Sequence, residues 1–312
     1  MPHHAIARKI ETMSYHTLVS ATELLALVAS KQPLRIFDCS FDLMRPGAGQ
    51  ADYLSAHIPG AVYADLDKSL SAKHGAHVVN GAHGVITASG ADAPASGGRH
   101  PLPNREKFSI WLSSIGFAND MQAVVYDRNG SNYCGRLWWM LKWCGHRNVA
   151  MLDGGLQAWQ AAGGGVNSGE EPAHFQSSFT LGEELVRLVD AKAVMTGLGR
   201  QSLIDARGAP RFRGEVEPLD PVAGHIPGAL NRPFTENFGP DGKFKPAAQL
   251  KAEFEGLLGQ RDPSTVVHHC GSGVSALPNL IAMEIAGLGS SALYAGSWSD
   301  WCSDRGRPTA KS

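Results

Sequence analysis

The chain carries the same short segment twice, and the distance between the two copies constrains its fold. Ala56–Ala61 (AHIPGA) recurs as Gly224–Ala229 (GHIPGA), about half of the chain later. An apolar run that ends in Asp precedes each copy, at Ile36–Asp38 and at Leu203–Asp205. This period is far too long for a solenoid, so the sequence predicts two copies of one domain.

The repeat divides the 312 residues into two domains of ordinary size. We expect a first domain over residues 15–162, a linker over residues 163–178 and a second domain over residues 179–309. The linker segment is rich in Gly, Asn, Ser, Glu and Pro, a composition that is typical of connections between domains.

Short apolar runs alternate with helical patterns in both copies. The expected strands are Leu34–Phe37, Ala123–Tyr126, Ser202–Ile204 and Thr265–His268. The expected helices are Thr22–Ala29, Cys134–Trp143, Ala247–Leu258 and Ser275–Ala286. This alternation predicts an α/β fold in which each domain is a mainly parallel sheet flanked by helices. Ligands of such sheets bind at the carboxyl ends of the strands.

Cys270 stands at such a strand end and opens the loop Cys-Gly-Ser-Gly-Val-Ser. A thiol on a loop that enters a helix faces backbone N–H groups and the positive end of the helix dipole, which favour the thiolate. Gly271 and Gly273 allow the backbone to curl around the sulfur. The alternative interpretation is that Cys270 is a buried structural cysteine without a catalytic function. Asp127 occupies the equivalent place in the first copy, so we expect the second copy to be the catalytic one.

Composition excludes several other classes of protein. The 28 Lys and Arg residues nearly balance the 29 Asp and Glu residues, so no basic field predicts nucleic-acid binding. We expect no membrane span and no secretory signal, because no apolar run is long enough. Five cysteines at irregular spacings predict no disulfide framework and favour a cytoplasmic location. No cofactor is expected, and His74, His77 and His83 lie at spacings that are weak evidence for a metal.

These motifs together resemble two-domain rhodanese-type sulfurtransferases over nearly the whole chain, from Val19 to Pro308. Within that family the Cys-Gly-Ser-Gly-Val-Ser loop is similar to that of 3-mercaptopyruvate sulfurtransferases. Thiosulfate-preferring members usually have basic residues directly after the cysteine, whereas Gly271 and Ser272 are neutral. Direct charge pairing suits a compact dianion such as thiosulfate, while mercaptopyruvate carries its carboxylate several bonds from the sulfur.

The resemblance implies a double-displacement reaction without a cofactor. Cys270 would take the sulfane sulfur of a small-molecule donor as a persulfide, and a second thiophile would then remove it. The acceptors that the family implies are cyanide, a small thiol or a thioredoxin-like protein dithiol. Arg211 matches the family arginine that binds the donor carboxylate. A second arginine found in many members is missing from the stretch Glu217–Pro221, which keeps a thiosulfate preference open.

The family also supplies acid–base candidates from the first domain. Asp67 and His100 match residues proposed to work with the loop serine, here Ser272, in protonating the enolate that leaves with carbon–sulfur cleavage. The further expected substrate contacts are Arg99, Gly271, Gly273, Val274, Ser275 and Trp298. Solvated surface roles are the alternative for Asp67 and His100.

Two competing functions make different demands on the sequence. Some phosphatases share the rhodanese fold, but their loop needs an arginine six positions after the cysteine, where this chain has Ala276. A non-enzymatic persulfide carrier would share the loop and the first half-reaction, but it would have little use for Asp67 and His100.

The residues Ser71–Gly98 form a long segment without a core pattern, which predicts an insertion or a lid.

Overall fold

The computed structural model describes residues 13–45, 47–72 and 93–312. These residues form two five-stranded sheets with the strand orders β1-β5-β4-β2-β3 and β6-β10-β9-β7-β8, and every strand pair is parallel. The two orders are the same pattern in two copies. The predicted α/β fold with tandem domains is therefore confirmed.

The first sheet contains strands β1 (Leu18–Val19), β2 (Leu34–Asp38), β3 (Val62–Tyr63), β4 (Gln122–Tyr126) and β5 (Val149–Leu152). Its helices are α1 (Ala21–Ser30), α2 (Ala48–Ser55), α3 (Arg105–Ser114), α4 (Cys134–Trp143) and α5 (Gly155–Ala161). Local sequence sets the first helix boundary, because Ser20 and Glu23 form a capping box at the start of α1.

The second sheet contains strands β6 (Arg187–Val189), β7 (Ser202–Asp205), β8 (Leu230–Asn231), β9 (Val266–His269) and β10 (Ala292–Tyr294). Its α-helices are α6 (Ala191–Thr196), α7 (Ala209–Arg213), α8 (Ala247–Leu258), α9 (Leu277–Ile285) and α10 (Ser297–Trp301). Two 3₁₀ turns, η1 (Phe234–Asn237) and η2 (Pro263–Thr265), complete the domain. The expected helices over 134–143 and 247–258 match α4 and α8, whereas α9 begins at Leu277 because the cysteine loop continues through Ala276.

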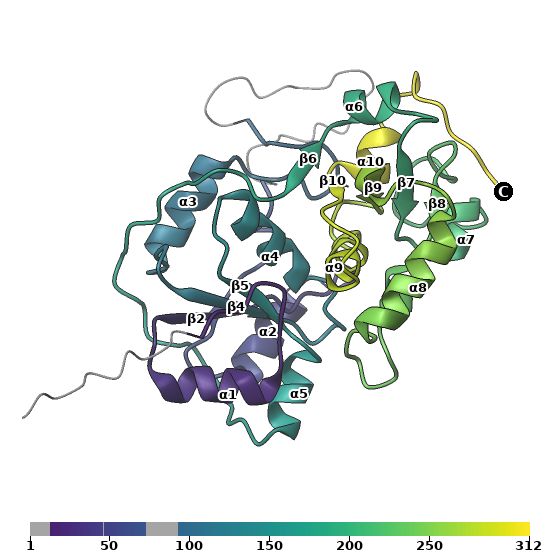
Figure 1. Ribbon diagram of the computed structural model, residues 1–312. Coiled ribbons are helices and arrows are strands. Elements are labelled where there is room, and N and C mark those ends of the chain that lie inside the picture. Colours follow the sequence, from purple (N-terminus) through teal and green to yellow (C-terminus); the bar gives the residue numbers. More distant parts are fainter. Residues whose placement is uncertain (1–12, 46, 73–92) are drawn as a thin grey trace, which may run out of the picture.

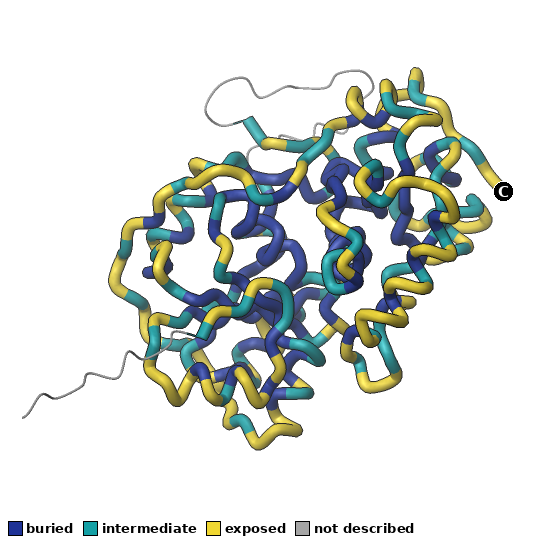
Figure 2. Tube along the Cα trace, in the orientation of Figure 1, coloured by how far each residue is buried: buried dark blue, intermediate teal, exposed yellow. Residues whose placement is uncertain are grey.

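One hydrophobic core joins the two domains. Helices α4 and α9 lie against each other where the domains meet (Figure 1), and every residue of α4 is buried. A Cβ added to Gly135 would lie 3.1 Å from the Cβ of Leu277, so the glycine permits this close approach. Trp138 and Trp139 belong to the same core, and Figure 2 shows buried segments in the interior of both domains. The interface is therefore packed like a domain interior.

The repeated His-Ile-Pro-Gly segment has the same role in both copies. His57 stacks on Tyr53, with 4.1 Å between the ring centroids, and its Nδ1 lies 2.8 Å from the Tyr53 carbonyl oxygen. His225 stacks on Phe212 at 3.9 Å and its Nδ1 lies 2.8 Å from the Phe212 carbonyl oxygen. The shared sequence thus encodes a shared structural turn.

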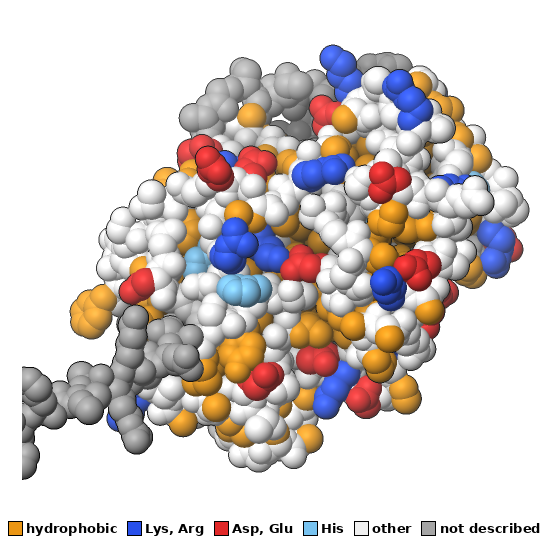
Figure 3. Space-filling view, viewed as in Figure 1, with side chains coloured by type: hydrophobic (Ala, Val, Ile, Leu, Met, Phe, Trp, Pro, Cys, Tyr) orange, Lys and Arg blue, Asp and Glu red, His pale blue; other side chains and the backbone are white. Residues whose placement is uncertain are grey.

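The remaining segments lie mostly at the surface. Residues 163–186, all of them described, contain no helix or strand and connect the two sheets. Most of the expected insertion Ser71–Gly98, including His74, His77 and His83, lies outside the described residues. Acidic and basic side chains are interspersed on the face drawn in Figure 3. In the part of the chain that the structure describes, no helix is both long and apolar enough to cross a membrane.

Candidate active site

Cys270 lies directly after β9 and is almost completely buried, with 2 % of its surface exposed. The loop that follows it turns at Gly273, whose φ is +76°. A Cβ at this position would lie 2.1 Å from the Ala295 carbonyl oxygen, so both the backbone angle and the space require glycine. The predicted function of Gly273 in shaping the loop therefore has a geometric basis.

A second loop, Gly296–Ser299, holds the cysteine loop in place. The Ser297 hydroxyl accepts a hydrogen bond from the Cys270 N–H (3.0 Å) and donates one to the Tyr294 carbonyl (2.9 Å). The Trp298 and Ser299 N–H groups donate to the Cys270 and Gly271 carbonyls. These bonds direct the Cys270 and Gly271 carbonyls toward the second loop.

The first domain shows what the loop conformation can bind. Asp127 stands in place of the cysteine, and its carboxylate accepts hydrogen bonds of 2.8–2.9 Å from four backbone N–H groups. The donors are Asn129, Ser131, Tyr133 and Cys134. Burial nevertheless raises the pKa of Asp127, because desolvation outweighs these bonds. The loop is thus an anion nest.

The second-domain loop has the same register. Gly130 (φ +66°) and Gly273 (φ +76°) occupy the same place, three residues after Asp127 and Cys270. Within the described residues, the N–H groups of residues 271–276 have no protein acceptor. By this correspondence, the Ser272, Val274 and Ala276 N–H groups can bind negative charge that develops on a Cys270 adduct. Val274 contributes its backbone, since its side chain is buried in the core, whereas Ser275 is only partly buried.

A chain of polar side chains reaches this loop from the first domain. His100 Nδ1 lies 2.8 Å from Ser272 Oγ, and His100 Nε2 lies 3.4 Å from Asp67 Oδ1. His100 is 2 % exposed, whereas the Asp67 side chain is 35 % exposed. The structure thus brings together the three residues that the sequence named. Asp67 is the member of this chain of contacts most open to solvent, and Ser272 belongs to the cysteine loop.

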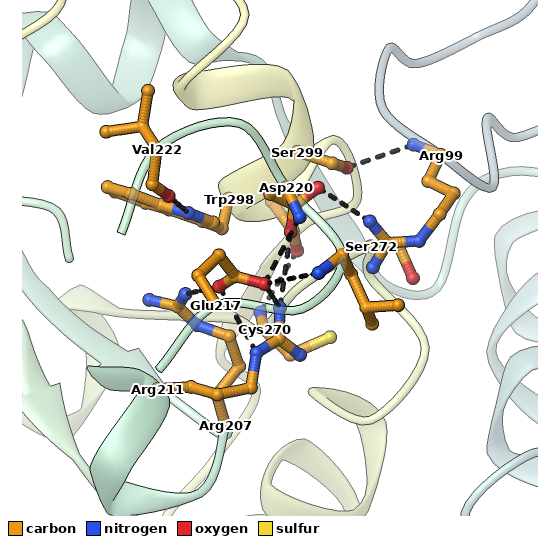
Figure 4. Close-up of polar contacts among 12 residues, drawn as sticks. Arg99, Arg207, Arg211, Glu217, Asp220, Val222, Cys270, Ser272, Trp298 and Ser299 are labelled. Carbon is orange, nitrogen blue, oxygen red and sulfur yellow. Dashed lines mark hydrogen bonds and ion pairs between the residues drawn. The ribbon is translucent and has the colours of Figure 1, made fainter. Parts of the chain in front are cut away.

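Two guanidinium groups, one from each domain, flank the loop at Gly271. A Cβ added to Gly271 would lie 3.1 Å from Arg99 Nη2 and 3.4 Å from Arg211 Nη1. Both arginines bind Asp220: Arg99 Nη1 lies 2.6 Å from Oδ1, and Arg211 Nη2 lies 3.2 Å from Oδ2. Arg211 also donates to both oxygens of Glu217. Figure 4 shows these side chains gathered around Cys270.

The arginines of this cluster are more exposed than the carboxylates that pair with them. The side chains of Arg99 and Arg211 are 23 % and 21 % exposed, whereas those of Glu217 and Asp220 are 3 % and 4 % exposed. Burial raises the pKa of Asp220, although Arg99 and Arg211 act in the opposite direction. The carboxylates therefore hold the guanidinium groups from behind and leave part of each one open to an anionic ligand.

The Trp298 side chain does not line the site, although its backbone N–H donates to the Cys270 carbonyl. The sequence expected it to contact substrate, but it is fully buried and its indole N–H donates to the Val222 carbonyl. Its ring lies under Arg207, at 4.8 Å from the guanidinium carbon. Arg207 in turn pairs with Asp205 (2.7 Å) and Glu217 (3.3 Å). Trp298 therefore packs against Arg207 and helps to position the ion pairs that Arg207 makes with Asp205 and Glu217.

Sequence reasoning missed Glu217, Asp220 and the left-handed backbone of Ser297. The two acids follow Arg211 by six and nine residues, in a segment that had attracted notice only because it lacks an arginine. Ser297 has φ +55°, and its counterpart Gly155 in the first copy has φ +61°. That glycine was the available signal that this position needs a left-handed backbone. Among the described residues, no cluster of His, Cys, Asp and Glu could hold a metal ion.

Comparison with known proteins agrees with this architecture. The family model described as "Rhodanese-like domain" matches residues 20–162 and 183–304. The chain is 42 % identical over 304 residues to a probable 3-mercaptopyruvate sulfurtransferase from Pseudomonas aeruginosa, covering 96 % of this chain and 99 % of the relative. It is 36 % identical over 296 residues to a putative thiosulfate sulfurtransferase from Mycobacterium tuberculosis, covering 94 % and 96 % of the two chains.

A solved structure gives the same result. The crystal structure of SseA from Escherichia coli, one of the 3-mercaptopyruvate sulfotransferases, matches with a TM-score of 0.72 and 30 % identity. The match covers 91 % of this chain and all of that protein. The relatives are named for two different sulfur donors, so the choice between donors depends on the residues of this site.

Proposed function

The chain belongs to the rhodanese family and is a sulfurtransferase, and from that premise we propose that it takes sulfur from 3-mercaptopyruvate through a persulfide on Cys270. One observation carries this choice of donor: the contact between His100 and Ser272, which brings an acid–base relay to the cysteine loop. Thiosulfate would release sulfite, a stable anion that needs no proton. Mercaptopyruvate releases an enolate, which does.

In the first half-reaction the Cys270 thiolate attacks the thiol sulfur of the donor. The new sulfur–sulfur bond forms as the carbon–sulfur bond breaks, and the electron pair remains on carbon as the enolate of pyruvate. A proton from the Asp67–His100–Ser272 relay converts the enolate into pyruvate. The N–H groups of the cysteine loop bind the negative charge of the persulfide.

The donor carboxylate binds at the arginine pair. Arg211 and Arg99 lie beside Gly271, and each has an exposed part. Arg99 comes from the first domain and supplies a second guanidinium to a site in which the Glu217–Pro221 segment has none. A planar carboxylate bound between two guanidinium groups would orient the donor sulfur toward Cys270.

In the second half-reaction a thiophile attacks the outer sulfur of the persulfide and restores the Cys270 thiolate. Cyanide leaves as thiocyanate, and a thiol leaves as a persulfide or, with a dithiol such as a thioredoxin-like protein, as a disulfide with release of sulfide. We propose these acceptors because each one is a nucleophile that can attack the outer sulfur of a persulfide.

The decisive test is kcat/KM for mercaptopyruvate and for thiosulfate, with cyanide as acceptor and Cys270→Ser as the blank. We expect a preference for mercaptopyruvate of about tenfold or more, which is about 1.4 kcal/mol of transition-state discrimination. A preference for thiosulfate would contradict the proposed donor. Stoichiometric pyruvate release without any turnover would instead favour a persulfide carrier.

A further inference from the structure

Arg136 of α4 is fully buried in the interior of the molecule. Its Nη2 donates to the His100 carbonyl (2.8 Å) and its Nε donates to the Leu70 carbonyl (3.3 Å). Its Nη1 is buried and has no hydrogen-bond partner. Carbonyl groups are therefore its polar contacts, and no carboxylate among the described residues pairs with it.

The next most buried arginines differ from Arg136 in this respect. Arg207 and Arg232 are each 4 % exposed, and each pairs with a carboxylate at 2.7 Å. A buried charge is costly unless an opposite charge compensates it. Arg136 has no such partner among the described residues. We therefore expect a negative charge that develops in the active site to compensate the charge of its guanidinium.

Cys270 is the group that can provide this charge. Burial lowers the pKa of Arg136 to about 9, and interaction with a Cys270 thiolate acts in the opposite direction. The guanidinium therefore stays protonated at neutral pH. A charge interaction is mutual, so a cation that gains from the thiolate also favours the thiolate.

Packing fixes this arrangement across the domain interface. Gly135, the neighbour of Arg136, lies against Leu277 and Ile281 of α9, the helix that follows the cysteine loop. The His100 residue whose carbonyl binds Arg136 contacts Ser272 of that loop through its ring. Arg136 is thus linked to the loop by both helix packing and the His100 backbone.

We propose that Arg136 is a positioning residue of the sulfur site: its carboxylate-free guanidinium holds the His100 backbone and supplies a buried positive charge that stabilises the Cys270 thiolate and persulfide. This inference rests on the proposed role of Cys270 as the sulfur-accepting nucleophile. It assigns part of the electrostatics around Cys270 to a residue of the first domain, which has Asp127 in place of that cysteine.

The other charged groups around the loop are arranged differently. They are the Arg99–Asp220, Arg211–Glu217 and Arg207–Asp205 pairs, together with the His100–Asp67 pair and His269. Arg207 also interacts with the charge of Cys270, but Asp205 and Glu217 compensate it. Unlike these three arginines, Arg136 has no carboxylate among the described residues to neutralise its charge.

The test measures Cys270 alkylation by iodoacetamide as a function of pH, read by mass spectrometry of the Cys270 peptide. In Arg136→Gln we expect the pH of half-maximal rate to rise by about one unit, so that alkylation at neutral pH slows about tenfold. Arg136→Lys keeps the charge and should shift the midpoint much less. Lys142→Gln is the matched control, because Lys142 also links α4 to α9 but pairs with Glu284.

A folded Arg136→Gln protein with the wild-type alkylation profile would overturn the inference and leave Arg136 a structural role. If Arg136→Gln does not fold, Arg136→Lys decides: a wild-type midpoint supports the charge role, and a midpoint raised by about one unit, although the charge is kept, contradicts it. Alkylation does not require turnover. Persistent turnover of Cys270→Ser would therefore refute the proposed function separately from the inference.

Discussion

His100 Nδ1 lies 2.8 Å from Ser272 Oγ, so a residue of the first domain contacts the cysteine loop of the second. Arg99, the residue before His100, crosses the same interface to Asp220. In the proposed mechanism neither domain contains a complete site, because Cys270 and the His100–Asp67 pair come from different copies of the repeat. The proposal therefore gives the first copy, which has Asp127 in place of Cys270, a part in catalysis.

The relay makes a prediction that separates the two donors. His100→Gln and Asp67→Asn should lower kcat/KM for mercaptopyruvate by about 100-fold, because the enolate loses its proton source. Turnover of thiosulfate should change by less than about threefold, since sulfite leaves unprotonated. Steady-state kinetics with both donors checks this. Equal losses with both donors would mean that His100 acts by holding Ser272 and not by moving a proton.

The arginine pair and its carboxylates should give opposite effects on substrate affinity. Arg211→Gln removes a guanidinium that binds the donor carboxylate, and we expect KM for mercaptopyruvate to rise about tenfold with a smaller change in kcat. Asp220→Asn removes the negative charge shared by Arg99 and Arg211, so KM for the same donor should fall. A rise in KM for both variants, with both proteins folded, would exclude carboxylate binding at this pair.

Much of the fold follows from the sequence because the repeat encodes it twice. The apolar runs before Asp38 and Asp205 became β2 and β7, and the glycine-spaced loop after Cys270 turned as expected at Gly273. Placing Asp67 and His100 depended on family resemblance. No local pattern relates them to Ser272, which follows His100 by 172 residues and Asp67 by still more.

Other parts of the site could not be read from local patterns. Glu217 and Asp220 look like a solvated acidic turn, and only the folded chain shows them buried behind two arginines. Arg136 lies in a helix whose every residue is buried, which sequence periodicity cannot reveal because such a helix has no polar face. Trp298 was expected in the pocket, but its ring packs in the core and contacts the guanidinium of Arg207.

Ser297 combines backbone strain with a hydrogen bond, and two substitutions separate these contributions. Its φ of +55° is unfavourable for a residue with a Cβ, by about 1 kcal/mol. Ser297→Ala keeps the strain and leaves the Cys270 N–H and the Tyr294 carbonyl without their partner, so we expect a loss of about 2–3 kcal/mol. Ser297→Gly loses the same bonds but relieves the strain.

The free energy of unfolding in urea measures both variants. Ser297→Gly should be more stable than Ser297→Ala by about 1 kcal/mol, while both variants lose turnover because the cysteine loop is no longer held. A glycine variant that is less stable than the alanine variant would show that the left-handed backbone is not strained at this position.

His268, two residues before Cys270, makes stability depend on pH. It is fully buried, neither ring nitrogen has a hydrogen-bond partner, and burial lowers its pKa to about 3 from an ordinary value near 6.5. His269 and Arg232 act in the same direction as burial. Below pH 6.5 the unfolded chain therefore binds a proton that the folded chain does not. The stabilisation by neutral His268 is complete above pH 6.5 and is lost as the pH falls toward 3.

Between pH 7 and pH 5 this single group should cost the wild-type protein about 2 kcal/mol. His268→Leu removes the titration, so its free energy of unfolding should fall less over the same range by about that amount. Urea unfolding at the two pH values gives the comparison, with the exposed His16→Gln as the control. If His268→Leu lost as much stability as the wild type between pH 7 and pH 5, protonation of His268 would not be what destabilises the folded chain in acid.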